Sequence, residues 1–223
     1  MFELQPVLYR TTMLTIDHAI IAVQDPAATA EELVRRGLRA IPGGRHPGHG
    51  TGNWIVPLGS AYLELMTVID ADEAEGSPMG RWVLRSSRHG DRLAAVCLRT
   101  DAIDDVAHRI GHRPEPMSRE RDDGTVLRWR LAGLEAAMSD EHLPFFIAWD
   151  VDDDQHPGRM PVDHDVTVDG ISWIEYGGDP ERLAGWLGDH SLPIRSVDEQ
   201  PGPRRLAIAT ADGPVIIAAT GPI

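Results

Sequence analysis

The chain has 223 residues, enough for one large domain or two small ones with a substantial core. Its 35 acidic and 21 basic residues give a formal net charge of −14, which argues against nucleic acid and anionic membrane surfaces as partners. The single cysteine, Cys97, excludes an intrachain disulfide and a Cys-rich zinc site. The sequence has neither a long apolar run nor a signal-peptide pattern, so a cytoplasmic protein is expected.

The first predicted strand covers residues 15–23, an apolar segment rich in β-branched side chains. Asp25 and Pro26 have the residue types of a helix cap and a first helical residue, so a helix is expected at residues 27–36, with Gly37 at its end. Three further strands are expected at residues 38–41, 53–57 and 61–69. The predicted order is therefore β-α-β-β-β.

The same order recurs along the chain. A strand at residues 91–100 is followed by Asp101 as helix cap, a helix at 102–110, and strands at 115–119, 125–131 and 145–149. A third, shorter unit has a strand at 170–178, the cap Asp179, a helix at 181–187, and strands at 204–210 and 215–218. The caps are separated by 101 − 25 = 76 and 179 − 101 = 78 residues, which indicates internal repetition rather than a coincidence of common elements.

These elements predict an α+β protein with four parts. They are an N-terminal extension (residues 1–13), a first βαβββ module with a connecting helix (14–89), a second βαβββ module with a long loop (90–165), and a partial third βαββ unit (166–223). The connecting helix is expected at residues 77–89. The loop at residues 150–164 is polar and acidic, and loops of that length are often functional.

Tandem βαβββ units, an Asp-Pro helix cap and a first strand of the form DHxxIAV resemble the glyoxalase-like branch of the vicinal oxygen chelate superfamily. The resembling stretches are residues 16–26, 43–53, 61–66, 143–150 and 156–164. The resemblance implies that paired modules curl into a cupped, open barrel. In metal-dependent members it implies a divalent ion on the concave face, held by the first and last strands of each module. Other members bind drugs without metal, so the fold alone does not give the function.

His18 and Glu64 match the family's first and second ligand positions. Strand alternation places His18 on one face with Ile20, and Glu64 on one face with Tyr62 and Met66. An imidazole or carboxylate on an apolar strand needs a partner, so both are candidate metal ligands and a candidate catalytic acid–base pair. The alternatives are a hydrogen-bonded core histidine and a glutamate on a solvated face.

The second half of such a ligand shell is missing. Alignment of the helix caps places Ala94 opposite His18, and Ala148 stands where related chains often carry Glu or Gln. Replacement ligands would have to come from His46, His49, His89 or His164. The cofactor expected is therefore either one divalent metal (Zn, Fe, Mn, Ni or Co) or none.

The glycine-rich stretch GGRHPGHGTGNW, residues 43–54, is expected to be a connection at the mouth of the cup. Its glycines favour exposed backbone N–H groups, and its polar side chains add donors, which indicates a substrate-binding segment with His46, His49, Thr51 and Asn53 as candidates. A flexible β-connection without a ligand is the alternative. Trp149 and His164 complete the predicted substrate-binding residues.

Three functional hypotheses stay open. The first is a glyoxalase-like lyase, isomerase or dioxygenase that acts on a small oxygenated molecule, with His18 and Glu64 polarising or deprotonating it. The second is a drug-sequestering protein, similar to bleomycin-resistance members, that needs no metal. The third is a structural descendant without a site. The expected partner is a small molecule. Both a monomer and a homodimer fit the sequence, because two modules in one chain complete the barrel and dimerisation is not needed to build it.

Overall fold

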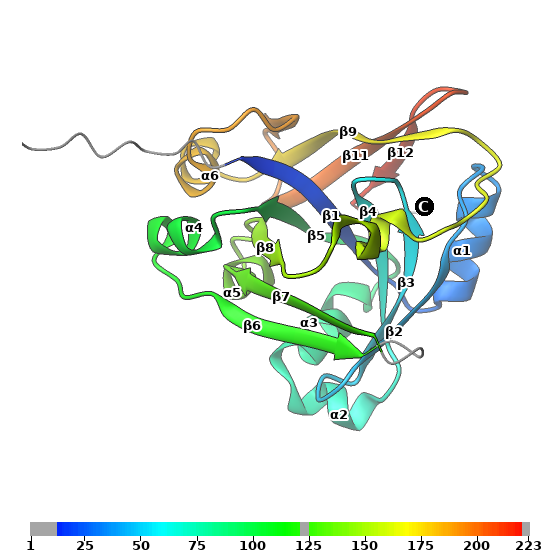
Figure 1. Cartoon of the computed structure of the whole chain (residues 1–223), viewed down its shortest axis with the longest axis horizontal. Helices are drawn as coiled ribbons and strands as arrows, with labels where there is room; N and C mark the ends of the chain where they lie inside the picture. The colour runs from blue at the N-terminus through cyan, green and yellow to red at the C-terminus, as the bar shows by residue number, and fades with distance from the viewer. Residues whose placement is uncertain (1–12, 121–124, 220–223) are drawn as a thin grey trace, which may run out of the picture.

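The computed structural model describes residues 13–120 and 125–219 of the chain (Figure 1). Of the expected N-terminal extension, only Met13 belongs to this described part. The first half of the chain contains β1 (Leu14–Ala22), α1 (Pro26–Val34), β2 (Ile41–His46), β3 (Thr51–Pro57), β4 (Tyr62–Val68), α2 (Ala71–Gly76) and α3 (Pro78–Ser87). The predicted β-α-β-β-β order is confirmed here, with α2 as an additional helix.

The second module repeats this order. It contains β5 (Arg92–Thr100), α4 (Ile103–Ile110), β6 (Glu115–Glu120), β7 (Val126–Ala132), α5 (Leu134–Met138) and β8 (Phe145–Trp149). The prediction that Asp101 caps α4 is wrong: the cap position is Ala102, whose N–H donates to the Thr100 hydroxyl at 3.1 Å. By contrast, Asp25 accepts from Ala27 N at 2.9 Å and caps α1 as predicted.

Both modules contribute to one eight-stranded sheet with the order β2-β3-β4-β1-β5-β8-β7-β6. In each module the first and last strands pair in parallel, and the first strands of the two modules pair antiparallel at the centre. The sheet curls until Arg119 on one edge strand packs against Gly44 on the other, where a Cβ would lie 2.8 Å from Nη1. The cupped, nearly closed sheet that the resemblance implies is therefore confirmed (Figure 1).

Strand alternation separates two apolar clusters. On β1, Ala19 and Ile21 pack on the outer face with Leu33 of α1 and Val106 of α4, while Ile20 and Ala22 lie in the cup-side cluster. The outer face is covered by helices and by a second sheet, so apolar side chains are excluded from water on both sides of the central strands. Alternation from Ala19 to Ala22 gives each side of the sheet its own core, while Leu14 and Ile16 join the outer cluster before a register shift in β1.

The C-terminal part forms the second sheet, with the order β10-β9-β11-β12. Its elements are β9 (Val168–Gly177), α6 (Pro180–Leu187), β10 (Ile194–Val197), β11 (Gly202–Thr210) and β12 (Val215–Ala218), one strand more than the predicted unit. The order of elements repeats that of the modules, but the pairing does not, because β9 pairs in parallel with β10 and not with the last strand. β11 lies against β5, on the outer face of the large sheet.

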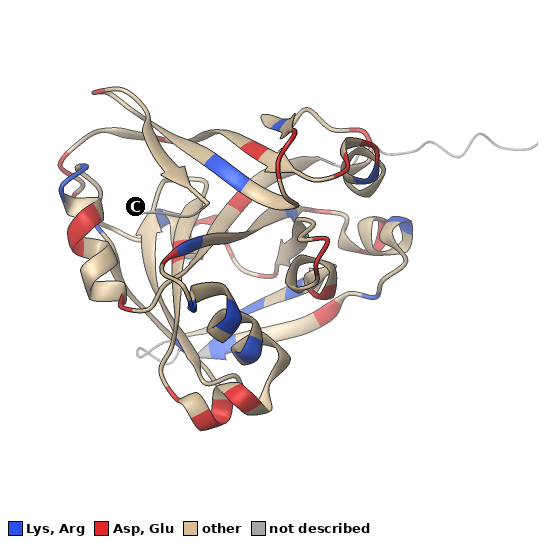
Figure 2. Cartoon of the chain, turned by 180° about the vertical axis from the view of Figure 1, so that it is seen from behind, with Lys and Arg blue, Asp and Glu red and all other residues tan. Residues whose placement is uncertain are grey.

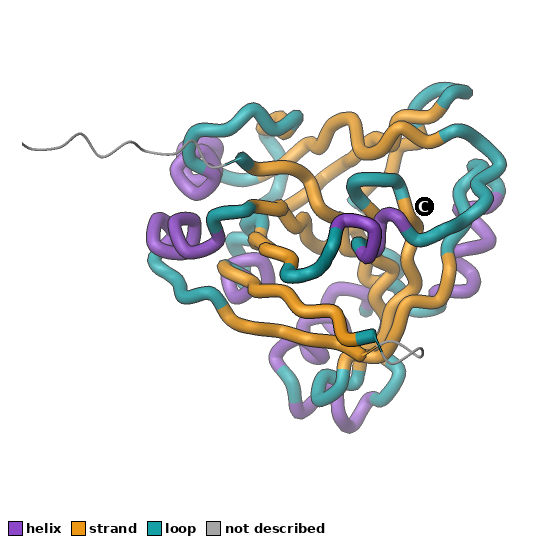
Figure 3. Tube along the Cα trace, viewed as in Figure 1, coloured by secondary structure: helices purple, strands orange, loops and turns teal. Residues whose placement is uncertain are grey.

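The long segment between β8 and β9 is mostly loop, as predicted, with two short helical turns, η1 (Asp153–Gln155) and η2 (Pro157–Arg159) (Figure 3). Acidic residues gather on α2, at the bottom of the view in Figure 2, in keeping with the acidic excess of the chain. In the part of the chain that the structure describes, every helix is too short or too polar to cross a bilayer.

The glycine-rich stretch is a hairpin of β2 and β3 rather than a long connection, so the predicted strand at residues 38–41 is displaced to Ile41–His46. Its strand glycines are needed because side chains fill the space that a Cβ would occupy. A Cβ on Gly43 would lie 2.1 Å from Asn53 Oδ1, and one on Gly44 would meet Arg119. Only residues 47–50 form the turn, where Gly48 and Gly50 have positive φ angles of 79° and 63°.

Two substitutions separate backbone strain from close packing in this turn. Both Gly48→Ala and Gly50→Ala place a side chain at positive φ, which costs about 1 kcal/mol. A Cβ on Gly50 would also lie 2.3 Å from Ala74 N, whereas one on Gly48 has no neighbour within 4 Å among the described residues. We expect Gly50→Ala to lower the free energy of unfolding by about 1–3 kcal/mol more than Gly48→Ala in urea titrations. Equal losses would contradict the close approach of the turn to α2.

Candidate functional site

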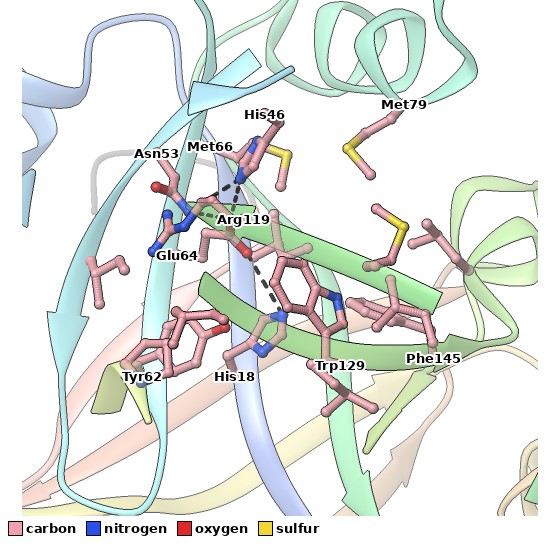
Figure 4. Close-up of a pocket in the computed structure, with 18 of the residues that line it drawn as sticks. His18, His46, Asn53, Tyr62, Glu64, Met66, Met79, Arg119, Trp129 and Phe145 are labelled. Atoms are coloured by element: carbon pink, nitrogen blue, oxygen red, sulfur yellow. Dashed lines mark hydrogen bonds and ion pairs between the residues drawn. The ribbon is translucent and has the colours of Figure 1, made fainter. Parts of the chain in front are cut away.

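The concave face of the sheet holds a partly open cavity of about 100 Å³, which limits a ligand within it to a very small molecule. Most of its wall is apolar and includes Met66, Met79, Trp82, Met117, Trp129 and Phe145. The polar side chains His18, His46, Asn53, Tyr62, Glu64 and Arg119 gather along one wall (Figure 4). The first module supplies all of these except Arg119, which lies on β6.

His18 faces the cavity from β1, as alternation predicts, but its neighbour Asp17 also turns toward it. The pairing of β1 with β5 is irregular between Ile16 and His18, and this local distortion of the strand allows adjacent side chains to meet. Asp17 Oδ1 lies 2.7 Å from His18 Nδ1. Since a carboxylate only accepts hydrogen bonds, Nδ1 carries a proton, and the neutral form of the ring would present the lone pair of Nε2 to the cavity.

The Asp17 carboxylate is fully buried and accepts from four side chains. Besides His18 on Oδ1, its Oδ2 lies 2.9 Å from Arg99 Nε, 3.0 Å from Trp149 Nε1 and 3.1 Å from His156 Nε2. Burial alone would raise the pKa of Asp17, but the hydrogen bonds and charges of His156 and His18 hold it well below its usual range. Asp17 therefore stays ionised and keeps its donors oriented.

Glu64 faces the cavity from β4 and is held from the hairpin. Its Oε1 accepts from Asn53 Nδ2 at 2.6 Å and lies 3.6 Å from His46 Nε2. The Asn53 carbonyl oxygen in turn accepts from Gly44 N at 2.8 Å, which identifies Nδ2 as the end that reaches Glu64. Asn53 on β3 thus fixes Oε1 of Glu64, and Oε2 points toward His18.

His18 Nε2 and Glu64 Oε2 lie 3.6 Å apart, too far for a direct hydrogen bond. Two acceptors at this separation leave a place for a proton donor from a bound molecule. The Tyr62 ring stacks on the imidazole with centroids 4.5 Å apart and planes at 23°, which fixes the ring plane of His18. Burial, together with the charges of Asp17 and Glu64, raises the pKa of Tyr62 well above its ordinary value, so its hydroxyl stays protonated.

The other predicted binding residues divide into two groups. His49 and Trp149 line the cavity, with His49 Nδ1 2.7 Å from the Ser77 hydroxyl. Thr51 and His164 are not among the residues that line it. Thr51 is fully buried and orients His46, with Oγ1 3.0 Å from its Nδ1, and His164 Nε2 donates to the Pro57 carbonyl oxygen at 2.6 Å.

Sequence reasoning missed three residues of the site. Alternation assigned Asp17 to the face opposite His18, and nothing in the sequence indicated the irregularity that brings them together. His156 is buried in the loop after β8, and its contact with Asp17 depends on the folded loop. Arg119 ends the strand predicted at residues 115–119 and is followed by the charged residues 120–123, a pattern that suggests solvent exposure rather than a cavity wall.

The described residues do not fit the four-ligand metal shell that the resemblance implies. The cup-facing residues of β8 are Phe145, Ile147 and Trp149, which offer no carboxylate or imidazole. Ala148 packs toward the outer core, whereas Ile147 and Trp149 on either side of it face the cup. The expectation that Ala148 marks a ligand position is therefore corrected. Ala94 is buried in the cup-side apolar cluster. The second module therefore contributes no ligand from its closing strand.

Among the described residues, one group of three ligand-type side chains has ligand atoms within 4.8 Å of one another: Asp17, His18 and Cys97. Asp17 and His18 already bind each other through Nδ1. Burial raises the pKa of the Cys97 thiol well above its ordinary value, which disfavours the thiolate that a metal would bind. Of the proposed replacement ligands, His46 approaches Glu64, while His89 is exposed.

Comparison with known proteins places this geometry in a family. Residues 16–191 match the family model described as a glyoxalase-like domain. No curated protein has a matching sequence. A hypothetical protein from Staphylococcus aureus has a similar solved structure, with a TM-score of 0.63 and 16% identity, over 92% of this chain and 84% of that one. At this identity the likeness concerns the fold alone.

Two further solved structures are more distant. Methylmalonyl-CoA epimerase from Mycobacterium tuberculosis has a TM-score of 0.41 and 16% identity, over 64% of this chain and 92% of that one. A triple mutant of 4-hydroxymandelate synthase from Streptomyces coelicolor has a TM-score of 0.49 and 15% identity, over 92% of this chain and 62% of that one. Neither likeness is close enough to bear on the reaction.

The buried Asp17 carboxylate gives a prediction for stability at low pH. Its folded pKa lies below the unfolded value of about 3.9, so the carboxylate stabilises the fold above that pH, and this stabilisation is lost as the pH falls from about 4 toward the folded pKa. We expect Asp17→Asn to lower the free energy of unfolding by about 3–5 kcal/mol at pH 7 and to flatten its pH dependence below about pH 4.

Asp104→Asn is the matched control, because Asp104 forms an exposed ion pair with Arg130. Its effect should stay within about 0.5 kcal/mol. Denaturant titrations from neutral to acidic pH measure both variants. A pH dependence in Asp17→Asn that is as steep as that of the unmodified protein would contradict an ionised, buried Asp17.

Proposed function

Because the chain belongs to the glyoxalase-like domain family of the vicinal oxygen chelate superfamily, we propose that it is an enzyme that transfers a proton on a small oxygenated molecule held in the cup. The reaction class is that of an isomerase or lyase acting at a carbon next to a carbonyl group. The observation that carries the proposal is the oriented pair of His18 and Glu64, whose facing atoms are separated by 3.6 Å at the cavity wall.

His18 is the proposed general base. Its Nδ1 proton is held by Asp17, so the free lone pair of Nε2 accepts a proton from the substrate. Asp17 then stabilises the resulting imidazolium, because it remains a carboxylate in a site from which water is excluded. The proton moves from the acidic C–H bond to Nε2, and the electron pair of that bond moves toward the carbonyl oxygen.

Glu64 and Tyr62 complete the proposed proton transfer. Glu64 Oε2 faces the gap beside Nε2, takes the hydroxyl proton of the substrate and delivers it to the former carbonyl oxygen, while Asn53 keeps Oε1 in place. His18 returns its proton to the neighbouring carbon, so both side chains end in their starting states. Tyr62 keeps its proton and lines the cavity, so its hydroxyl is a donor to the carbonyl oxygen on which charge develops. This account needs no step through a metal ion.

A second candidate function is binding without turnover, as in drug-sequestering members of the superfamily. The observation that favours it is the wall of the cavity, where Trp82, Trp129 and Trp149 lie with three methionines. Aromatic and methionine side chains offer a large adaptable apolar surface to a ligand. The two functions differ in whether His18 and Glu64 change a bound molecule or only hydrogen-bond to it.

Hydrogen–deuterium exchange at carbon tests the enzymatic proposal directly. The protein is incubated in D₂O with a panel of small hydroxyketones, aldehydes and oxo acids, and loss of the C–H signal is followed by NMR. We expect exchange of at least one compound, with a rate that falls by about 10²–10⁴-fold in His18→Ala and Glu64→Gln. His108→Ala, which changes an exposed histidine of α4, is the matched control and should retain the rate. Exchange that survives in His18→Ala would refute His18 as the base.

Metal analysis of protein purified without a histidine tag separates this account from a metal-dependent one. Since no described residue of the second module that lines the cavity is a carboxylate, an imidazole or a thiol, we expect no stoichiometric Zn, Fe, Mn, Ni or Co after purification from supplemented medium. Stoichiometric metal that is lost in both His18→Ala and Glu64→Ala would show that the first module binds a metal ion. The proton-transfer account without metal would then be wrong.

A further inference from the structure

Arg119 lies where the two edges of the large sheet meet. It extends from β6 into the cavity, and its guanidinium packs on the backbone of Gly44 in β2, the opposite edge strand. A Cβ at residue 44 would lie 2.8 Å from Nη1 and 3.3 Å from the guanidinium carbon, so the glycine is what admits the charged group to this position. In Figure 4 the Arg119 side chain lies beside Asn53 and Glu64, on the polar wall.

Arg119 is the cation at this end of the cavity. Within the described residues, no carboxylate lies within 4.0 Å of its nitrogens, and Glu64 instead has its ion-pair neighbours in His18 and His46. Burial lowers the pKa of His46, and the charge of Arg119 lowers it further against the opposing effect of Glu64, so His46 is neutral at pH 7. The polar wall thus carries a permanent positive charge, while the other walls of the cup are apolar.

Building on the proposed function, we propose that Arg119 binds the carboxylate of the substrate, which is a small monocarboxylic acid with an apolar body. A guanidinium presents two parallel N–H groups that match the two oxygens of a carboxylate. A phosphate dianion fits less well, because one arginine would have to balance two charges next to the Glu64 carboxylate. The net charge of −14 also repels polyanions.

The other walls of the cavity indicate what kind of substrate body fits beside the carboxylate. Trp129 and Met117 stand on the same hairpin as Arg119, and Phe145 closes the cup from β8, so the body of the acid lies among apolar side chains. In Figure 4 Arg119, Glu64 and His18 all lie on the polar wall. A carboxylate at Arg119 therefore lies on the same polar wall as the gap between His18 Nε2 and Glu64 Oε2, so the acid enters the cavity with its charged end on the side of the proposed proton transfer.

Matched pairs of ligands that differ only in charge test this assignment. The probes are isovalerate with isovaleramide and phenylacetate with phenylacetamide, titrated by calorimetry at pH 7 and low salt. We expect the unmodified protein to bind at least one of the acids about tenfold or more tightly than its amide, as a charge-assisted hydrogen bond provides. Arg119→Gln should abolish the preference, and Arg119→Lys should retain only part of it.

Arg128→Gln is the matched control, because it removes the same charge from an exposed position on the adjacent strand β7. It should leave the preference unchanged, and thermal unfolding of each variant shows that the fold is intact. An acid preference that persists in folded Arg119→Gln, or no saturable binding of either acid at millimolar concentration, would overturn the proposal. Inorganic phosphate that competes with the acids as strongly as they bind would overturn the assignment to a carboxylate.

These outcomes are independent of catalysis. His18→Ala removes the proposed base but leaves Arg119 in place, so the acid preference should survive in it. An Arg119-dependent preference without carbon exchange would leave the anion site standing and would remove the enzymatic function. Exchange that depends on His18 without any acid preference would support the enzymatic function and would remove the anion site at Arg119.

Discussion

The buried carboxylate of Asp17 is the interaction on which the candidate site depends. One side chain on β1 accepts hydrogen bonds from His18, from Arg99 on β5, from Trp149 on β8 and from His156 in the loop beyond it. It therefore joins the first strands of both modules, the closing strand of the second and the loop that follows. An unpaired charge at this depth would be strongly destabilising, so the four donors and the carboxylate require one another.

This network also determines the chemistry that faces the cavity. Orientation of His18 by Asp17 leaves Nε2 free, while Asn53 holds one oxygen of Glu64 and leaves the other free. The two free acceptors are brought to 3.6 Å by adjacent parallel strands, β1 and β4. Proximity of this kind needs no loop movement, because both side chains are buried and stand on strands of the sheet.

Much of the fold was predictable because its strands have a regular period. Alternation along β1 and β4 correctly placed His18 with Ile20, and Tyr62 with Glu64 and Met66, on the cup side. The first strand of the β2–β3 hairpin was predicted at the wrong position. Its glycines, Gly43 and Gly44, are needed because Asn53 and Arg119 approach them from other strands. Local sequence does not carry that information. The pairing of β9 with β10 was likewise missed, since element order does not determine strand order.

The site was less predictable than the fold. His18 and Glu64 were found because they match the positions of a family motif, but the partner of His18 was not. A period of two places Asp17 and His18 on opposite faces, and only the irregular pairing of β1 with β5 brings them together. Arg119 was missed because a charged segment near a turn indicates solvent exposure, whereas the curvature of the sheet carries its side chain into the cup.

The protonation of the His18 ring tests the central claim most directly. Nitrogen-15 NMR of the imidazole distinguishes the two neutral tautomers, and Asp17→Asn serves to assign the signal. The Asp17 carboxylate at 2.7 Å from Nδ1 predicts that, in the neutral form of the ring, the proton is on Nδ1 and Nε2 is unprotonated. A neutral ring with the proton on Nε2 would contradict the account, because neither the orientation by Asp17 nor a base facing Glu64 would then exist.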